Sequence, residues 1–110
     1  MAPLLYSRWR HGRDTYAYRH VAVESRAIDG RVEIRPVPGQ AFSPELAVQC
    51  SRRLIDLQRY PLGSRFLLFA KLTDRLGGTP FLYAYHGDAD VVMTPAEVTK
   101  FLGEFRRGRI

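Results

Sequence analysis

The sequence predicts an α+β fold, in which an antiparallel sheet of five to six strands, able to curve strongly, carries two amphipathic helices on one face. Three observations predict it: an Asp-Gly turn between two alternating segments, a second pair of strand-like segments in the C-terminal half, and two stretches with apolar residues at helical spacing. The expected order of elements is β-β-β-α-β-β-β-α. With 110 residues, the chain has the length of a single domain, residues 1–110.

The first hairpin is predicted by Asp29-Gly30, a residue pair that two-residue hairpin turns favour. With this pair as the loop, segments 21–28 and 31–36 become neighbouring strands with a defined register. Two opposite pairs join opposite charges, and each such pair stabilises a ribbon by roughly 0.2–1 kcal/mol. One face of the hairpin is therefore expected to meet the core and the other to meet water. The residues expected opposite each other are Val23 with Pro36, Glu24 with Arg35, Ser25 with Ile34, Arg26 with Glu33 and Ala27 with Val32.

The strand that leads into this hairpin is expected to begin near Asp14. Its tyrosines, Tyr16 and Tyr18, fall on even positions, whereas the valines that follow fall on odd positions. A β-bulge near Arg19-His20 would insert one residue and produce this change of phase. The alternative is that both tyrosines face outward and that the odd-numbered face stays buried throughout.

A helix is predicted over residues 43–60. Ser43 is a suitable N-cap, and Pro44 suits the first helical position. Pro61 marks the end of the pattern, because proline does not continue a helix. The apolar residues that recur at helical spacing are Leu46, Cys50, Leu54, Leu57 and Tyr60.

A second helix is predicted at the C-terminus. Thr94 and Glu97 have the spacing of a capping box, with Pro95 at the first helical position. Gly108 is expected to end the helix. The apolar face of this helix is predicted to consist of Val98, Phe101, Leu102 and Phe105.

The second half of the sheet is predicted from three segments. Residues 65–73 are apolar on both alternating faces, which is typical of a strand covered on both sides. A glycine-containing loop joins them to a strand at 81–86, and residues 91–93 add a short strand. The two Tyr-Ala-Tyr sequences, at 16–18 and 83–85, are therefore expected to lie in neighbouring strands whose rings pack together.

The net charge of +6 points to a negatively charged partner, and 15 of the 17 basic residues are arginine. Arginine matches phosphate and carboxylate geometry, and basic domains of this kind often contact nucleic acid. The same charge also fits a surface that merely keeps a small domain soluble. The candidate nucleic-acid-binding residues are Arg8, Arg10, Arg13, Arg52, Arg53 and Arg59.

The single cysteine, Cys50, excludes an intrachain disulfide and fits a reducing compartment. The sequence contains neither a signal-peptide pattern nor an apolar run of the roughly 20 residues that a membrane helix needs. We therefore expect a cytoplasmic protein without a membrane partner. No metal site and no cofactor are expected, because no two of the three histidines have the spacing of a helical metal pair.

The leading interpretation is a small basic binding protein without enzymatic activity, whose partner is nucleic acid or an acidic protein surface. An alternative is a small-molecule pocket or a small metal-independent enzyme, so activity remains an open question at this point. A third interpretation is a homodimeric interaction module built on unpaired sheet edges. The candidate ligand-binding residues are Tyr16, Tyr18, Tyr83, Tyr85 and His86.

Overall fold

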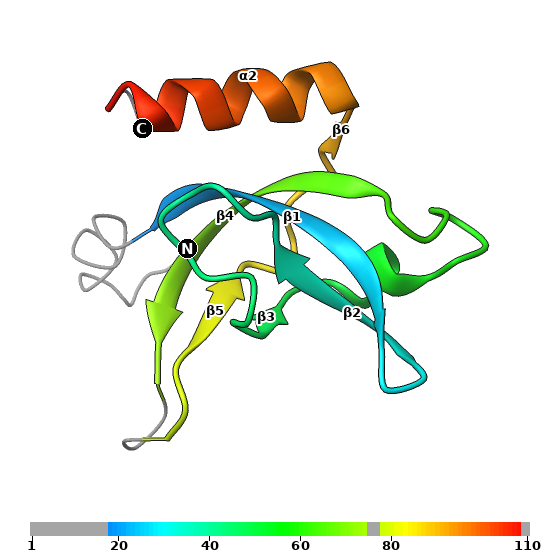
Figure 1. The fold of residues 1–110 in the computed structure, drawn as a ribbon. Coiled ribbons are helices and arrows are strands. Elements are labelled where there is room, and N and C mark those ends of the chain that lie inside the picture. The colour runs from blue at the N-terminus through cyan, green and yellow to red at the C-terminus, as the bar shows by residue number, and fades with distance from the viewer. Residues whose placement is uncertain (1–17, 75–77, 109–110) are drawn as a thin grey trace.

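The computed structural model describes residues 18–74 and 78–108, whose strands form one curved sheet beside a single α-helix (Figure 1). The helical elements are a 3₁₀ helix, η1 (Arg52–Ile55), and the α-helix α2 (Pro95–Arg106). The strand order is β2-β1-β4-β5-β3, and β6 pairs with the first residues of β4. The sheet curls nearly into a barrel, since its two edges, β2 and β3, line one cavity. The strands are β1 (Arg19–Ile28), β2 (Arg31–Pro36), β3 (Val48–Gln49), β4 (Arg65–Thr73), β5 (Phe81–Ala84) and β6 (Val92–Met93).

The predicted fold class is wrong in two respects. The sheet is mixed rather than antiparallel, because β3 runs parallel to β5. The described chain also contains one α-helix instead of two, so the order β-β-β-α-β-β-β-α is not observed. In place of the helix predicted over residues 43–60, the chain forms β3, η1 and turns.

The segment that replaces the helix is extended, and its exposure alternates. Even-numbered residues from 42 to 50 are half-buried, whereas the odd-numbered residues are exposed. Leu46, Val48 and Cys50 pack against the main core from this segment. The spacing of four between Leu46, Cys50 and Leu54 fits a period of 2 as well as a period of 3.6, so the apolar positions alone did not distinguish strand from helix. The segment forms an extended strand rather than a helix because β3 pairs with the edge of β5.

The first hairpin forms in the predicted register, and all five predicted pairs are observed. Both Asp29 and Gly30 have positive φ angles, 51° and 78°, as the favoured two-residue hairpin turn requires. The ion pairs differ from those expected across β1 and β2. Glu33 binds Arg35 on its own strand at 2.7 Å, and Glu24 lies 3.5 Å from Arg65 on β4.

β1 is continuous from its first residue and pairs with β4 without a bulge, so the bulge predicted near Arg19-His20 is wrong. Its valines face the core, whereas Tyr18 and His20 face the opposite side. There the ring centroid of Tyr18 lies 5.4 Å from that of Phe69. The alternative is therefore confirmed for Tyr18, which faces away from the core, but not for the whole odd-numbered face, because Arg19 is exposed; Tyr16 lies outside the described residues.

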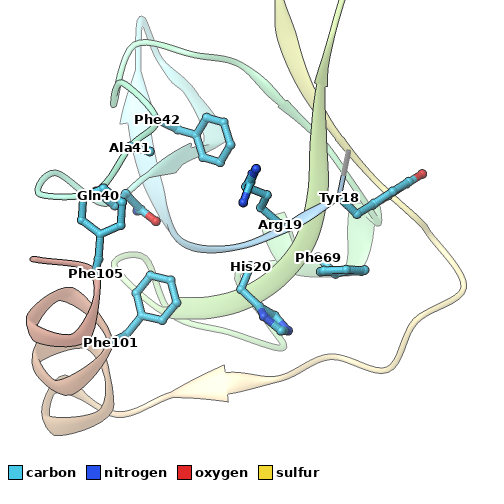
Figure 2. A pocket seen from close by; sticks show the side chains of 9 residues that line it. All are labelled: Tyr18, Arg19, His20, Gln40, Ala41, Phe42, Phe69, Phe101 and Phe105. Carbon is cyan, nitrogen blue, oxygen red and sulfur yellow. The ribbon is translucent and has the colours of Figure 1, made fainter. Parts of the chain in front are cut away.

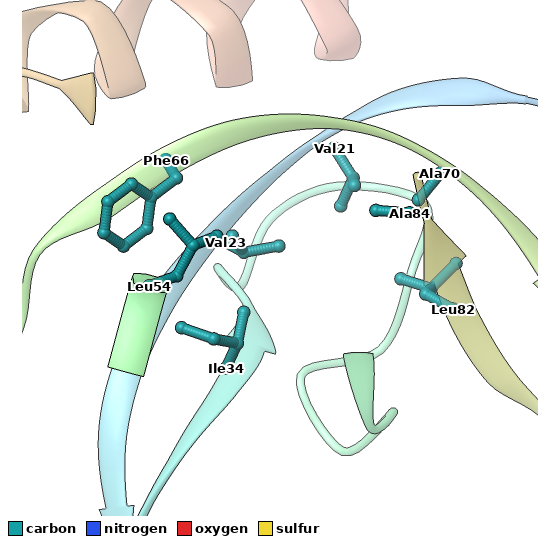
Figure 3. Close-up of a cluster of buried hydrophobic side chains, with 8 residues drawn as sticks. All are labelled: Val21, Val23, Ile34, Leu54, Phe66, Ala70, Leu82 and Ala84. Atoms are coloured by element: carbon teal, nitrogen blue, oxygen red, sulfur yellow. The ribbon is translucent and has the colours of Figure 1, made fainter. Parts of the chain in front are cut away.

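The main core lies beneath the arch that β1 and β4 form (Figure 3). Leu54 of η1 is 2% exposed and closes the open underside of the arch. Truncation of so buried a leucine to alanine costs about 2–5 kcal/mol. The residues of this core are Val21, Val23, Ile34, Leu54, Phe66, Ala70, Leu82 and Ala84.

α2 covers the opposite, convex face of the sheet (Figure 1). Its predicted capping box is confirmed: the Glu97 N–H donates to the Thr94 hydroxyl at 3.1 Å, and the Thr94 N–H donates to the Glu97 carboxylate at 2.8 Å. Val98 is buried with Ala22 and Val37 in a second, smaller core. Within the described ranges, the helices are too short or too polar to cross a bilayer.

Candidate functional site

A cavity of about 330 Å³ lies where the start of β1 meets the loop at residues 40–42 and the C-terminal half of α2 (Figure 2). We term it the aromatic cavity. Six of its nine lining residues carry a ring, which is the kind of surface on which flat molecules bind. The lining residues are Tyr18, Arg19, His20, Gln40, Ala41, Phe42, Phe69, Phe101 and Phe105.

Phe69 is the middle one of three rings that line one side of this cavity. It lies directly opposite His20 in the pairing of β1 with β4, and their ring centroids are 5.0 Å apart. The ring of Tyr18 lies on its other side, at 5.4 Å and an interplanar angle of 31°. Phe69 is nevertheless 39% exposed. The three rings therefore form a cluster that stabilises the pairing of the strands and still leaves an aromatic surface accessible.

Gln40 fixes the loop that forms one wall. Its side-chain Oε1 accepts from the backbone N–H of Ala22 at 3.2 Å, and its Nε2 donates to the C=O of Ala22 at 2.7 Å. The same Nε2 donates to the C=O of Val37 at 2.8 Å. The amide thus continues the ladder of β1 beyond the end of β2, and it holds Ala41 and Phe42 beside the cavity.

α2 supplies the facing wall through Phe101 and Phe105, which lie four residues apart and therefore on one helix face. Phe101 packs against the small core beneath α2, whereas Phe42 packs against the main core. Figure 2 shows Phe101 directed toward His20, with Phe42 on the other side of β1. The aromatic cavity consequently lies at the edge of β1, between the two cores of the molecule.

Positive charge borders the cavity. Arg19 is exposed, and its side chain forms no hydrogen bond or ion pair with another described residue. The Lys71 ammonium lies 5.6 Å from the centroid of the Tyr18 ring, within the range of a cation–π contact. The nine described residues that line the cavity include no aspartate or glutamate. The local field therefore favours an anionic group at the mouth of the cavity.

The predicted ligand-binding set is divided by the sheet. β4 lies between β1 and β5, so the strand that follows the first Tyr-Ala-Tyr sequence does not neighbour the strand that leads into the second, while residues 16 and 17 themselves lie outside the described residues. Tyr18 lines the aromatic cavity, and Tyr16 lies outside the described residues. Tyr83 and His86 contact each other at a centroid distance of 5.8 Å, and Tyr85 is 62% exposed beside a second cavity.

The predicted arginine set does not line the aromatic cavity. Arg8, Arg10 and Arg13 lie outside the described residues. Arg52 lies on η1 and Arg59 in the turn that follows, both exposed, whereas Arg53 is held in an ion pair with Asp90. The cation that does line the cavity, Arg19, belongs to neither predicted set.

Asp90, Arg53 and Tyr60 form a second polar group, which we term the Asp90 cluster. The Asp90 carboxylate accepts from Arg53 Nη2 at 2.8 Å, from Arg53 Nε at 3.2 Å and from the Tyr60 hydroxyl at 2.7 Å. The hydrogen bond from Arg53 holds the pKa of Asp90 below its usual value, and the bond to Asp90 raises the pKa of Tyr60. Because each polar group is satisfied by another, this cluster connects the β5–β6 loop to η1.

Cys50 lies beside the same cavity as Asp90. Burial, with a smaller contribution from Asp90, raises the pKa of the Cys50 thiol to about 11. The thiol therefore remains protonated at neutral pH and is a poor nucleophile. Among the described residues, no group of three or more His, Cys, Asp or Glu is placed to hold a metal ion.

Sequence reasoning assigned Phe69, Phe101 and Phe105 to the core and did not select Gln40. A signal for Phe69 was present, because its face of β4 also carries Arg65 and Lys71 and is therefore a mixed face rather than a buried one. No local signal identifies Gln40, whose partner Ala22 is 18 residues away.

Comparisons of this chain with models of protein families, with curated proteins and with solved structures find no match. The fold and the site themselves define the class: over residues 18–74 and 78–108, a nearly closed mixed β-sheet with one α-helix on its convex face and an aromatic cavity at the junction.

Proposed function

We propose that this chain is a binding protein whose aromatic cavity takes a nucleotide unit, a flat base that carries a phosphate. The single observation that carries the proposal is the convergence of Tyr18, His20 and Phe69 on one accessible surface, in a cavity that Arg19 lines from the other face of β1 (Figure 2). Stacking rings and an arginine that has no acidic partner among the described residues are two elements of the kind that bind nucleotides without regard to their order in a strand.

The rings support the base-binding part of the proposal. A volume of about 330 Å³ lies at the lower end of the range of ligand sites, so the cavity suits a single ring system rather than a large ligand. Each base that stacks on an aromatic side chain gains roughly 1–3 kcal/mol. Phe69 is exposed enough to offer such a contact, and Phe101 closes the opposite side.

The charge supports the phosphate-binding part. The guanidinium of Arg19 matches the geometry of phosphate oxygens, and the net charge of +6 attracts anions to the whole surface. A free nucleotide and a nucleotide within single-stranded nucleic acid present the same chemistry to this site. Titration with a nucleoside monophosphate in one arm and a short labelled single strand in the other separates the two sources.

The test compares native protein with Arg19→Gln and Phe69→Ala by fluorescence anisotropy or calorimetry at two salt concentrations. We expect Phe69→Ala to weaken binding roughly tenfold or more, because a stacking contact is lost. Arg19→Gln is expected to weaken binding and to reduce the salt slope by about one phosphate contact. Arg59→Gln, which removes an exposed arginine that does not line the cavity, serves as the matched control and is expected to bind like native protein.

Three results contradict the proposal. One is that neither the nucleotide nor the single strand binds at low salt. Another is that both cavity variants bind as tightly as native protein. The third is that Arg59→Gln or Arg52→Gln loses binding while Arg19→Gln keeps it, which moves the site to the surface around η1.

A further inference from the structure

The edge of β1 at His20 is open on one side among the described residues. β1 pairs with β2 only from Val23 onward, whereas its pairing with β4 extends back to Arg19. In an antiparallel strand, the N–H and C=O groups of every second residue point to the same side. Those of Ala22 point away from β4, because they bond to Gln40 and to the chain that follows β2. Those of His20 therefore point the same way.

These two backbone groups of His20 have no hydrogen-bond partner within the described part of the chain. His20 lines the aromatic cavity, and Ala41 and Phe42 line it from the facing loop. A donor and an acceptor thus lie side by side at the rim of a ring-lined cavity. A few placed polar groups of this kind are what orient a ligand within a largely apolar site.

Gln40 demonstrates what fits such a pair. Its planar amide accepts from the N–H of Ala22 at 3.2 Å and donates to the C=O of Ala22 at 2.7 Å. One amide therefore satisfies both backbone groups of a residue on this edge of β1. The hydrogen-bonding edge of a nucleobase presents the same pattern, with a donor beside an acceptor in one plane.

We propose that the backbone N–H and C=O of His20 bind the donor–acceptor edge of the base in the aromatic cavity. This inference rests on the proposed nucleotide-binding function and adds the group that orients the ring. In adenine the exocyclic amino group donates to the C=O of His20, and the adjacent ring nitrogen accepts from its N–H. The other common bases offer an equivalent pair, so the site selects bases with an intact edge rather than one sequence.

An added β-strand from a peptide partner is the competing occupant. Such a strand needs a run of open backbone groups along the edge, and main-chain bonds then supply the affinity. Here the next pair along β1, that of Ala22, is already bonded to Gln40. Among the described residues, the open pair of His20 lies between aromatic rings and next to a pair that is already bonded, so it suits one flat ligand edge better than an extended chain.

The test compares adenosine monophosphate with purine riboside monophosphate, which lacks the exocyclic amino group and adds no bulk. We expect the analogue to bind roughly tenfold more weakly, because it leaves the C=O of His20 unpaired beside the bound ring. In the amide NMR spectrum, adenosine monophosphate is expected to shift the His20 N–H and to slow its exchange with solvent. His20→Ala, which keeps the backbone, is expected to retain the preference for adenosine monophosphate over the analogue.

The outcomes separate this inference from the proposed function. Equal binding of the two nucleotides, with an unshifted His20 amide, overturns the inference and leaves nucleotide binding intact. Absence of binding by both overturns the proposed function and this inference together. A His20 amide that responds to a short extended peptide but to neither nucleotide overturns the inference in favour of strand addition.

Discussion

The aromatic cavity and the Asp90 cluster both combine rings with arginine, yet they satisfy their polar groups in opposite ways. In the Asp90 cluster the carboxylate receives bonds from Arg53 and Tyr60, and the Tyr60 ring packs edge-on against Phe66 of the main core at 5.0 Å. In the aromatic cavity, Arg19 has no partner among the described residues. The first arrangement is expected to contribute to stability, whereas the second leaves the guanidinium of Arg19 for the ligand that we propose.

This difference explains why the shifted pKa values are found in the Asp90 cluster and not in the aromatic cavity, the proposed binding site. Shifted pKa values identify functional groups only probabilistically, because structural ion pairs shift them as well. Here the shifts at Asp90 and Tyr60 arise from bonds between groups that satisfy each other. Mutations that separate stability from binding therefore test the comparison directly.

The largest effect is expected from Gln40→Leu, because Gln40 is the polar side chain of the aromatic cavity that is committed to structure. The variant leaves the N–H of Ala22 without its acceptor in a fully buried residue. We expect a loss of about 2–3 kcal/mol in the free energy of unfolding, measured by urea denaturation, together with loss of nucleotide binding. Gln58→Leu, at an exposed glutamine in the turn after η1, is the control and should change stability by less than about 0.5 kcal/mol. A stable Gln40→Leu variant with native affinity would contradict the role of this amide.

The comparison also separates what the sequence could predict from what it could not. The hairpin at Asp29-Gly30 and the capping box at Thr94 are local signals, in which residues a few positions apart determine the geometry, and both predictions are confirmed. The helix predicted over residues 43–60 is not observed, because apolar residues spaced by four fit the period of a strand as well as that of a helix. The conformation is determined by the pairing of this segment with β5, which is distant in sequence. The aromatic cavity depends on pairings that are distant in sequence, such as His20 with Phe69 and Gln40 with Ala22. Without the strand order, no local pattern brings these residues together.

A smaller effect is expected at the Asp90 cluster. Asp90→Ala removes the acceptor of Arg53 and Tyr60, and we expect a loss of about 1–2 kcal/mol in the free energy of unfolding. The value is at the lower end of the range for charged hydrogen bonds, because the Arg53 side chain is 40% exposed and screened by solvent. Nucleotide binding should remain native, since Asp90 does not line the aromatic cavity. Asp88→Ala, at an exposed carboxylate in the same loop, is the matched control. A variant that keeps its stability but loses ligand affinity would reverse the roles assigned to the two regions.

The smallest effect is a dependence of stability on pH. The pKa of Asp90 is lowered in the folded state from its ordinary value of 3.8, so its contribution is complete above that value and is lost as the pH falls through the lower, folded pKa. The pKa of Tyr60 is raised from 10.0, so its contribution is complete below pH 10.0 and is lost as the pH rises through the higher, folded pKa. The hydrogen bond from Arg35 lowers the pKa of Glu33, so Glu33 also contributes to the loss of stability at acid pH. Urea unfolding of native protein, Asp90→Asn and Glu33→Gln at a series of pH values separates the contributions of the two carboxylates. Each of Asp90→Asn and Glu33→Gln should reduce the fall in the free energy of unfolding that native protein shows as the pH decreases. If Asp90→Asn leaves that fall unchanged, the Asp90 cluster does not contribute to stability in the way proposed here.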